Sequence, residues 1–420
     1  MAEKINENIT LHYVPMKKLK TSTIGVFIHR DLNEEDAAKN ALLPYVLKRG
    51  CALAPDSEAL ERKLDDLYGA GVRCGTLKKG LDHVIFFTLE SISEQYAPES
   101  EMLFEELTRL CMSLVFEPVT ENGGFKQSIM EQEKKNAIQR IDSVKNDKRS
   151  YASVRCIQEM CKGERFAVPS HGTVEGVNAI DGKILYAYYQ DIIVSSPMDI
   201  YVCGDCDIQK VCSIIKKSTE NKIFRSGKIS EAHVFRGNET VQTCEESMDV
   251  TQGKLSMGFT TGISAADEEY FALMVANSIF GGGAHSKLFN NVREKLSLCY
   301  YASSSVERYM GIMMVNAGIE FENYQKAYDE IMAQLEAVKR GEIEELEYTS
   351  SINALVTGLK ACKDDQYAMQ SFYLSEKIAG TNRNLDELID KISKVTVEDA
   401  VRAAQNIRLD TVYFLKGAEA

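Results

Sequence analysis

Short apolar runs bounded by polar residues predict the strands of the first half of the chain. Residues 9–16 (ITLHYVPM) and 21–29 (TSTIGVFIH) alternate or are continuously apolar, which is typical of β-strands. Residues 72–79 (VRCGTLKK) and 83–92 (HVIFFTLESI) predict two more strands. The stretch 178–205 predicts a helix, a Pro-containing turn and a strand, in that order.

Longer segments with helical spacing lie between these strands. Asn33 is placed to cap a helix over residues 34–49, and Asp56 is placed to cap a second helix that Gly69 stops. Helical patterns then dominate from about residue 101 to 162. Strands gathered together, with helices between and after them, predict an α+β sandwich domain.

The same order of elements returns in the second half of the chain. The elements expected there are a strand (254–262), a helix (267–280), a second helix (286–296), two paired strands (299–307 and 311–319), two long helices, and a closing helix, turn and strand (394–417). This order predicts that the second half repeats the first.

The repeat can be expressed as an offset along the chain. Placing Gly71 on Tyr300 gives 300 − 71 = 229 residues, and placing Gly204 on Gly417 gives 417 − 204 = 213 residues. A duplication of this period predicts two homologous domains. The boundary is expected in the polar stretch 218–231.

The sequence therefore predicts an α+β chain of two homologous sandwich domains, residues 1–222 and residues 223–420. A length of 420 residues suits two domains of ordinary size, and 44% hydrophobic residues indicate a folded chain. A formal net charge of −13 argues against nucleic acid as a partner and leaves basic peptides open.

No secretory leader or membrane helix is recognisable, because the N-terminus lacks an apolar core and no run approaches the ~20 apolar residues of a membrane span. Eleven cysteines without regular spacing fit reduced thiols, so a cytoplasmic location without a membrane partner is expected. The pair Cys203 and Cys206 forms an isolated CxxC, and a structural role is favoured over a redox one.

Residues 281–301, GGGAHSKLFNNVREKLSLCYY, offer the clearest candidate chemistry. Arg293 and Tyr300 stand seven residues apart, and a guanidinium with a phenol can stabilise developing negative charge. The alternative is an ordinary one, because an Arg-Glu-Lys helix face is often a solvated salt-bridge surface and strand tyrosines often pack. The glycines Gly281, Gly282 and Gly283 fit either close approach to a substrate or a helix stop.

This segment, the stretch 175–205 and EKKNAIQRI (133–141) resemble the insulinase and pitrilysin superfamily of zinc peptidases, family M16. The resemblance covers nearly the whole chain and is closest to the short branch with two domains per chain. It implies two αβ sandwich domains forming a half-clamshell. Active members have an HxxEH motif on the first helix, in which two His bind zinc and the Glu activates water, and a third ligand on a later helix.

This chain departs from the family pattern at every one of those positions. The resemblance places Ala41 and Tyr45 at the two His, Pro44 at the general base and Arg140 at the third ligand. Alanine and proline offer no ligand, and a guanidinium repels a cation. Proline inside a helix also costs roughly 3 kcal/mol, so drift of this helix from the metal-binding geometry is expected.

The remaining histidines do not offer an obvious replacement site. The six histidines are too far apart in sequence to form a zinc pair on one helix. His171 precedes Glu175 in a segment that the resemblance makes a turn, so a function for it is disfavoured. His285 beside the glycine run is a candidate substrate contact together with Gly281, Gly282 and Gly283.

The family resemblance assigns Arg293 and Tyr300 to substrate and oxyanion contacts. Because no zinc ligands accompany them, the leading hypothesis is a non-catalytic subunit whose pair acts in trans, in a heterodimer with an HxxEH-bearing homologue that holds the zinc. The chain itself is expected to bind no cofactor, and peptides are the expected substrate. The resemblance extends to the non-catalytic member of a Firmicutes pair associated with modification of elongation factor P.

Two other hypotheses remain open at this point. A scaffold or peptide-binding protein of the same fold would need no hydrolytic partner, and an autonomous metallopeptidase would need unfamiliar ligands. The sequence does not decide between a homodimer and a heterodimer, and it does not name the peptide.

Overall fold

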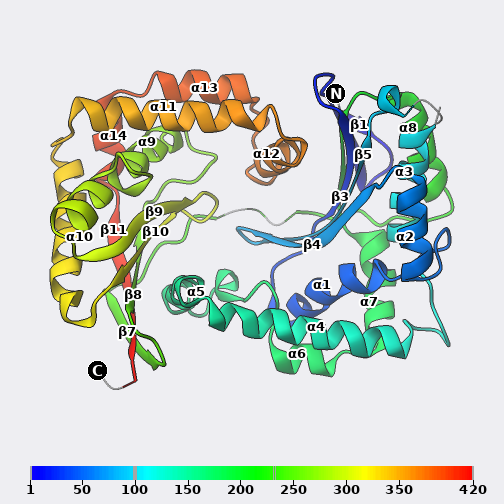
Figure 1. Cartoon of the computed structure of the whole chain (residues 1–420), viewed down its shortest axis with the longest axis horizontal. Helices are drawn as coiled ribbons and strands as arrows, with labels where there is room; N and C mark the ends of the chain where they lie inside the picture. Colours follow the sequence, from blue (N-terminus) through cyan, green and yellow to red (C-terminus); the bar gives the residue numbers. More distant parts are fainter. Residues whose placement is uncertain (1, 98–101, 230, 232, 419–420) are drawn as a thin grey trace. The chain divides into compact units, whose positions relative to one another are not determined.

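A computed structural model describes residues 2–97, 102–229, 231 and 233–418 of the chain (Figure 1). The chain forms two compact units, and neither is a single stretch of sequence. Unit 1 comprises Met1–Asp142, Val168–Glu231 and Cys362–Ile378, and unit 2 comprises Ser143–Ala167, Ala232–Ala361 and Ala379–Ala420. Each unit is built on its own β-sheet. These compact units are not the same as the two homologous halves predicted from the sequence. The predicted boundary between the halves, at residues 222 and 223, stays a prediction.

The sheet of unit 1 has six strands in the order β1-β2-β6-β3-β5-β4. Strands β2 and β6 are parallel, and the other neighbours are antiparallel. The strands are β1 (Ala2–Lys4), β2 (Ile9–Pro15), β3 (Thr21–Ile28), β4 (Gly71–Lys79), β5 (Asp82–Ile92) and β6 (Met198–Gly204). Strand β4 lies at one edge of this sheet.

Helices cover one face of this sheet with a continuous apolar core. Alternate residues of β3, such as Ile24 and Val26, join the apolar side chains of α1, α3 and α7 in that core. The helices of unit 1 are α1 (Glu34–Leu47), α2 (Ser57–Asp66), α3 (Leu103–Phe116), α4 (Gln127–Asn146, of which the last residues belong to unit 2), α6 (Val174–Ala179), α7 (Gly182–Ser195), α8 (Ile208–Thr219) and α12 (Gln366–Ile378).

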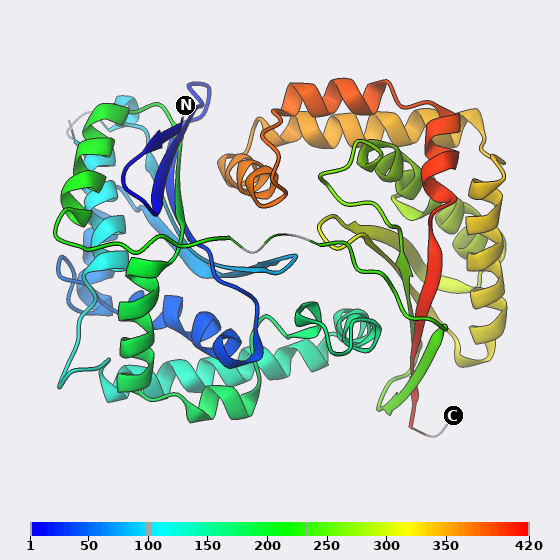
Figure 2. The ribbon, with the colours of Figure 1, turned by 180° about the vertical axis from the view of Figure 1, so that it is seen from behind.

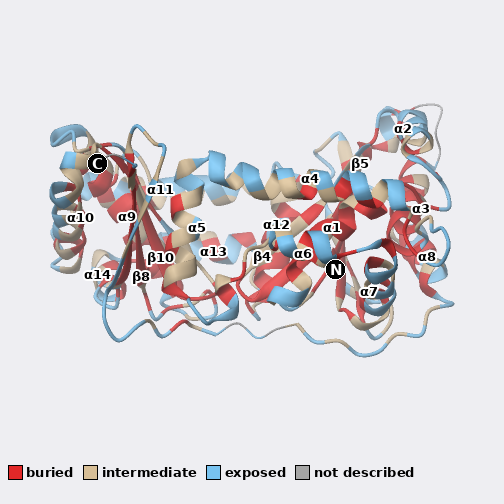
Figure 3. Cartoon of the chain, turned by 90° about the horizontal axis from the view of Figure 1, so that it is seen from below, coloured by how far each residue is buried: buried red, intermediate tan, exposed pale blue. Residues whose placement is uncertain are grey.

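The sheet of unit 2 has five strands in the order β7-β11-β8-β10-β9. Strands β7 and β11 are parallel and the rest are antiparallel, so the last strand of the chain lies inside the sheet (Figure 2). The strands are β7 (Gln242–Met248), β8 (Gly253–Thr260), β9 (Cys299–Glu307), β10 (Ile312–Ile319) and β11 (Arg408–Gly417). Strands β8 and β10 are almost wholly buried (Figure 3).

The helices of unit 2 follow the same plan as those of unit 1. They are α5 (Lys148–Met160), α9 (Tyr270–Gly281), α10 (Tyr324–Lys339), α11 (Glu345–Cys362), α13 (Leu385–Ser393) and α14 (Val397–Ala404), with a π-helix at Leu288–Lys295. None of the helices in the described ranges is long and apolar enough to traverse a bilayer.

The two sheets share one topology, which confirms the α+β class and the duplication. The order β2-β6-β3-β5-β4 in unit 1 corresponds to β7-β11-β8-β10-β9 in unit 2, and the single parallel pair occupies the same place in both. The offset of 229 residues places Gly71–Lys79 (β4) on residues 300–308, which overlap β9.

Equivalent helices are exchanged between the two halves of the sequence. Helix α5 comes from the first half but packs on β8 and β11 of unit 2, whereas α12 comes from the second half and packs on β3 and β6 of unit 1. The strands β8 and β11 are the counterparts of β3 and β6. Each half therefore supplies the helix that covers the second face of the other half's sheet.

A buried charge network attaches α12 to the unit 1 sheet. Lys377 Nζ of α12 lies 2.5 Å from Asp199 Oδ1 on β6, and the other oxygen of Asp199 lies 2.9 Å from His29 Nε2. His29 Nδ1 lies 2.6 Å from Asp82 Oδ2, and His12 Nε2 lies 2.6 Å from Asp199 Oδ1. Burial alone would lower the pKa of His29, but the two aspartates outweigh burial and raise this pKa to about 9.

A comparable polar cluster attaches α5 to the unit 2 sheet. Glu246 on β7 accepts hydrogen bonds from Tyr151 (2.6 Å) and Arg155 (3.2 Å) of α5. Tyr413 of β11 donates to the same carboxylate at 2.7 Å. In both units, therefore, a carboxylate on the sheet binds the exchanged helix.

We expect the His29 network to make stability depend on pH in a defined window. A folded-state pKa of about 9 against an ordinary 6.5 corresponds to about 3 kcal/mol, present in full below pH 6.5. This contribution is lost as the pH rises toward 9, because His29 must then give up its proton between two carboxylates. Urea unfolding should show a steeper loss of stability from pH 6.5 to 9 in the native chain than in His29→Gln.

The matched control is His83→Gln. His83 is also buried, but burial lowers its pKa to about 4, so it is neutral throughout this window. Above about pH 7.5, where an unfolded histidine is also neutral, the slope of stability against pH should therefore be unchanged in this variant. Equal slopes for His29→Gln and the native chain would contradict the charge assignment.

Candidate functional site

Helix α1 holds three of the four positions at which the zinc motif was expected. Asn33 caps it by accepting from Asp36 N at 2.8 Å, as the sequence predicted. Ala41 and Pro44 are buried, and Tyr45 is half-buried. The helix continues without interruption through Pro44 to Leu47, and the expected drift from metal-binding geometry stays a prediction.

Arg140 of α4 lies directly on the ring of Tyr45. The guanidinium carbon is 3.7 Å from the ring centroid, which is a close cation–π contact of roughly 1 kcal/mol. Two of the four motif positions are therefore brought together, but as a cation on an aromatic face. The side chains that could have held a metal have been replaced by a contact that supplies its own positive charge.

A second contact joins α1's C-terminal end to α4. Arg49 Nε donates to Glu133 Oε1 at 2.7 Å, and the side chain of Glu133 is only 2% exposed. A buried carboxylate with a bound guanidinium is satisfied and costly to separate. Neither residue was singled out from the sequence, although Glu133 lies one helical heptad before Arg140 on the same face of α4.

The groups around this contact are poor metal ligands at neutral pH. Burial raises the pKa of the Cys74 thiol on β4 to about 11, and burial also raises the pKa of Tyr45 despite the charge of Arg140. His171 is the exception, because burial and the charge of Arg140 lower its pKa and so favour the neutral imidazole that can ligate a metal. Within the described residues, no group of three or more His, Cys, Asp or Glu side chains could hold a metal ion. The residues at the motif do not fit zinc.

The glycine run in unit 2 is required by packing. Helix α9 ends at Gly281, where a Cβ atom would lie 2.5 Å from Ser304 Oγ of β9. A Cβ on Gly282 would lie 2.6 Å from Ser278 Cα. His285 Nε2 lies 3.1 Å from Ser278 Oγ, and burial lowers the pKa of this imidazole. A Cβ on Gly283 would lie 3.1 Å from His285 Cε1. The substrate role expected for the three glycines and His285 stays a prediction.

Arg293 lies on a π-helix, Leu288–Lys295, where the sequence had predicted an ordinary helix. π-helical turns are rare and are frequent at functional sites. The Arg293 side chain is 39% exposed, and its guanidinium carbon lies 4.7 Å from the Phe289 ring centroid. A buried ion pair between Lys287 and Glu347 (2.8 Å) fixes the residue just before this π-helix to α11.

Tyr300 lies on a second backbone irregularity. In the β9–β10 ladder, Tyr301 pairs with Gly318 and Cys299 pairs with Ile319, so Tyr300 is the extra residue of a β-bulge. Bulges re-aim side chains and occur often beside active sites. Tyr300 is 54% exposed, whereas the neighbouring Tyr301 covers Gly318.

Arg293 and Tyr300 are near the same end of β9. The charge of Arg293 reaches Cys299: burial raises the pKa of this thiol to about 11, and Arg293 opposes that rise. The Tyr300 hydroxyl donates a hydrogen bond to Glu320, which raises the phenol pKa. Glu320 was not identified from the sequence, because only the strand register brings it to Tyr300.

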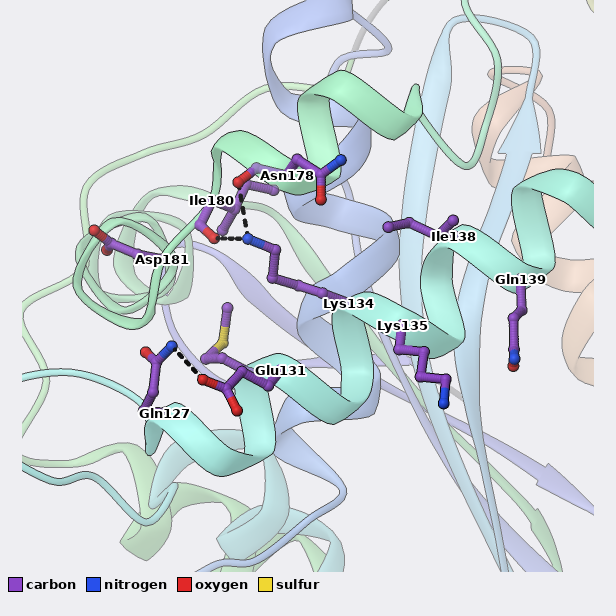
Figure 4. A pocket seen from close by; sticks show the side chains of 10 residues that line it. Gln127, Glu131, Lys134, Lys135, Ile138, Gln139, Asn178, Ile180 and Asp181 are labelled. Carbon is purple, nitrogen blue, oxygen red and sulfur yellow. Dashed lines mark hydrogen bonds between the residues drawn. The ribbon is translucent and has the colours of Figure 1, made fainter.

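A groove of unit 1 lies away from these residues. It has a volume of about 520 Å³ and lies along α4 beside α6 and the start of α7 (Figure 4). Lys134 Nζ donates to the carbonyls of Asn178 (2.8 Å) and Ile180 (2.9 Å), which ties the groove walls together. None of the candidate site residues lines it. The groove is therefore not the basis of a functional assignment.

Comparisons with known proteins agree with this geometry. A family model described as the peptidase M16 inactive domain matches residues 179–355. The chain is 38% identical over 411 residues to the probable inactive metalloprotease YmfF of Bacillus subtilis, covering 98% of this chain and 96% of that protein. It is 26% identical over 235 residues to the uncharacterized zinc protease YmxG of the same organism, covering 55% and 56%. A crystal structure of a conserved protein from Enterococcus faecalis matches with a TM-score of 0.92 and 30% identity, covering 100% and 99%.

We expect the purified chain to be indifferent to metal chelation. Its α1–α4 contact is made by Arg140 and Tyr45, so EDTA should leave the melting temperature unchanged and added zinc should not raise it. Thermal unfolding with elemental analysis of the dialysed protein measures this. A zinc-dependent rise in melting temperature with stoichiometric metal would contradict it. Arg140→Glu is the informative companion variant, because it removes the repelling charge.

Proposed function

Because the chain belongs to the peptidase M16 family, we propose that it is a non-catalytic subunit that pairs with an HxxEH-bearing homologue to form a zinc-dependent peptidase. The relationship confirms the resemblance drawn from the sequence, and the name of the 38% identical relative agrees with a member that is inactive on its own. The pairing, the peptide substrate and the contribution in trans are the proposed part.

One contrast supports this proposal above all others. The metal positions of unit 1 have become a cation–π contact, while Arg293 and Tyr300 of unit 2 stand on a π-helix and a β-bulge. Both irregularities interrupt regular hydrogen bonding, and such interruptions are common at functional sites. A chain that needed neither residue for function would have no evident reason to keep them on such backbone.

The proposed chemistry divides between the two subunits. The partner's zinc would supply an activated water, as zinc does in metallopeptidases. The guanidinium of Arg293 and the hydroxyl of Tyr300 would donate to the substrate carbonyl oxygen as it gains negative charge. Gly281, Gly282, Gly283 and His285 would border the peptide beside them. A homodimer would bring two such pairs together without a metal, so the heterodimer is favoured.

The proposed setting is the cytoplasm. All eleven cysteines are free thiols, and seven of them are buried. Free thiols in this number are typical of a reducing compartment. The net charge of −13 suits a subunit whose peptide substrates are basic or neutral.

A second candidate function is a scaffold or peptide-binding protein without a role in hydrolysis. One observation favours it, since the Tyr300 hydroxyl is already bound to Glu320 and Arg293 lies 3.3 Å from Glu294. Donors with standing partners are less available to a substrate. The two functions predict different binding partners in a pull-down experiment. Capture of an HxxEH-bearing chain supports the peptidase, and capture of a non-peptidase partner supports the scaffold.

The peptidase proposal predicts a loss of hydrolysis when the pair is removed. The chain is mixed with the HxxEH-bearing homologue of the same genome, and cleavage of a quenched fluorescent peptide is followed. We expect Arg293→Ala and Tyr300→Phe each to lower kcat/KM by about 10²-fold, as for other oxyanion donors. Binding of the two chains should be unchanged.

Matched controls come from exposed residues of the same types. Arg340→Ala and Tyr68→Phe change an exposed arginine and an exposed tyrosine away from the site and should leave hydrolysis unaffected. Full activity in the Arg293 and Tyr300 variants would refute the contribution in trans. Activity of the unmixed chain would refute the division of labour.

A further inference from the structure

A closed set of polar side chains surrounds Tyr300 at one end of the unit 2 sheet. Gly253 of β8 pairs with Ile319 of β10, and Ile319 pairs with Cys299 of β9, so these three strands end in one line. The residues flanking this line are Gln252, Lys254, Glu320 and Tyr300. They come from three strands but share one small region of unit 2.

The hydroxyl of Tyr300 is fully engaged in this set. It donates a hydrogen bond to Glu320, and the nearby side chain of Gln252 partly opposes the resulting rise of the phenol pKa. Lys254 Nζ donates to Gln252 Oε1 at 3.4 Å. A tyrosine hydroxyl has one hydrogen, so Tyr300 cannot donate to a second acceptor while it binds Glu320.

The β-bulge explains why this contact can form. In a regular ladder, Tyr300 would follow the alternation of the strand and pair directly with a residue of β10. The bulge takes it out of the ladder and leaves its ring 54% exposed beside Glu320, which directly follows β10. The backbone irregularity and the hydrogen bond therefore belong to one arrangement.

We propose that Glu320 is a latch that holds the Tyr300 hydroxyl in the unpaired subunit and must release it before Tyr300 can donate to a substrate carbonyl. This inference rests on the proposed function of Tyr300 in a paired peptidase. Glu320 acts only through Tyr300 and is therefore a positioning residue.

Two electrostatic effects predict that the Glu320 latch lowers the rate of the reaction. A carboxylate is a charged acceptor and competes strongly for the single hydrogen of Tyr300. A carboxylate close to the reacting carbonyl also repels the negative charge that forms there. Both effects oppose the reaction while Glu320 stays in place, so removing its charge should favour catalysis.

Lys254 provides an alternative partner for the released carboxylate. The charge of Glu320 acts on Lys254, raising a lysine pKa that burial otherwise lowers. Rotation of Glu320 from Tyr300 toward Lys254 would therefore exchange one charge-assisted contact for another. The latch can open without leaving Glu320 as an unpaired charge.

The first arm of the test uses the chain alone. Tyrosines labelled with ¹³C at the ring Cζ are titrated by NMR, and the Tyr300 signal is assigned as the one missing in Tyr300→Phe. The hydrogen bond to Glu320 raises the phenol pKa, so this pKa should fall in Glu320→Gln and stay unchanged in Glu322→Gln. Glu322 is exposed and is a matched control for loss of one negative charge. An unchanged Tyr300 pKa in Glu320→Gln overturns the latch, whatever the function of Tyr300.

The second arm uses the mixed peptidase with the quenched fluorescent peptide. Glu320→Gln should raise kcat/KM by about tenfold, since a neutral amide is a weaker acceptor than a carboxylate. Glu322→Gln should have little effect. In the background of Tyr300→Phe, the Glu320 substitution should give no such gain, because the hydroxyl it releases is gone.

The outcomes separate the two proposals. If Tyr300→Phe lowers hydrolysis but Glu320→Gln fails to raise it, the latch is wrong and the proposed function stands. If Tyr300→Phe leaves hydrolysis intact, the proposed function is wrong and the latch falls with it. A gain from Glu320→Gln that persists without the Tyr300 hydroxyl also overturns the latch.

Discussion

The fixed positive charge of Arg140 on the face of Tyr45 is the constraint from which the functional interpretation follows. A guanidinium stays protonated at any physiological pH, so the charge cannot be switched off to admit a metal ion. The aromatic ring stabilises that charge in place, and Arg49 with Glu133 makes a second contact between the same two helices. Unit 1 therefore has internal contacts at the positions that the family resemblance assigns to the metal.

Unit 2 differs from unit 1 because its candidate functional residues lie on irregular backbone. Its five strands repeat the order of five of the six strands of unit 1, yet its ladder is interrupted at Tyr300 and its chain forms a π-helix at Arg293. The duplicated scaffold therefore allows the two halves to diverge. One half has lost reactive groups on regular backbone, and the other presents polar groups on irregular backbone.

Periodicity and capping in the sequence were sufficient for much of the fold. Asn33 and Asp56 cap the helices that they were expected to cap, and the repeat offsets locate equivalent strands. The π-helical winding at Arg293 was not predicted, because it depends on tertiary packing that overrides local preference. The substitutions at Ala41, Pro44, Tyr45 and Arg140 were readable from the chain through the family pattern, whereas their physical contact was not.

The partners of the candidate residues could not be read from sequence for a related reason. Glu320 meets Tyr300 through a register shift between two strands, and sequence spacing alone does not reveal such a shift. Likewise, Lys377 reaches Asp199 across 178 positions of sequence because a helix of one half covers the sheet of the other. Long-range pairings of this kind are fixed by topology.

The exchanged helices α5 and α12 also bear on how such a chain could have arisen. A single ancestral half would have one sheet face with a carboxylate, like Asp199 or Glu246, and no helix of its own to neutralise and cover it. In two copies of that half, each copy could place this helix on the sheet of the other copy. This arrangement is that of a domain-swapped dimer. Joining the two copies end to end would keep these exchanged helices within one polypeptide. The repeated topology and the exchanged helices of the present chain are those expected of two such copies joined covalently.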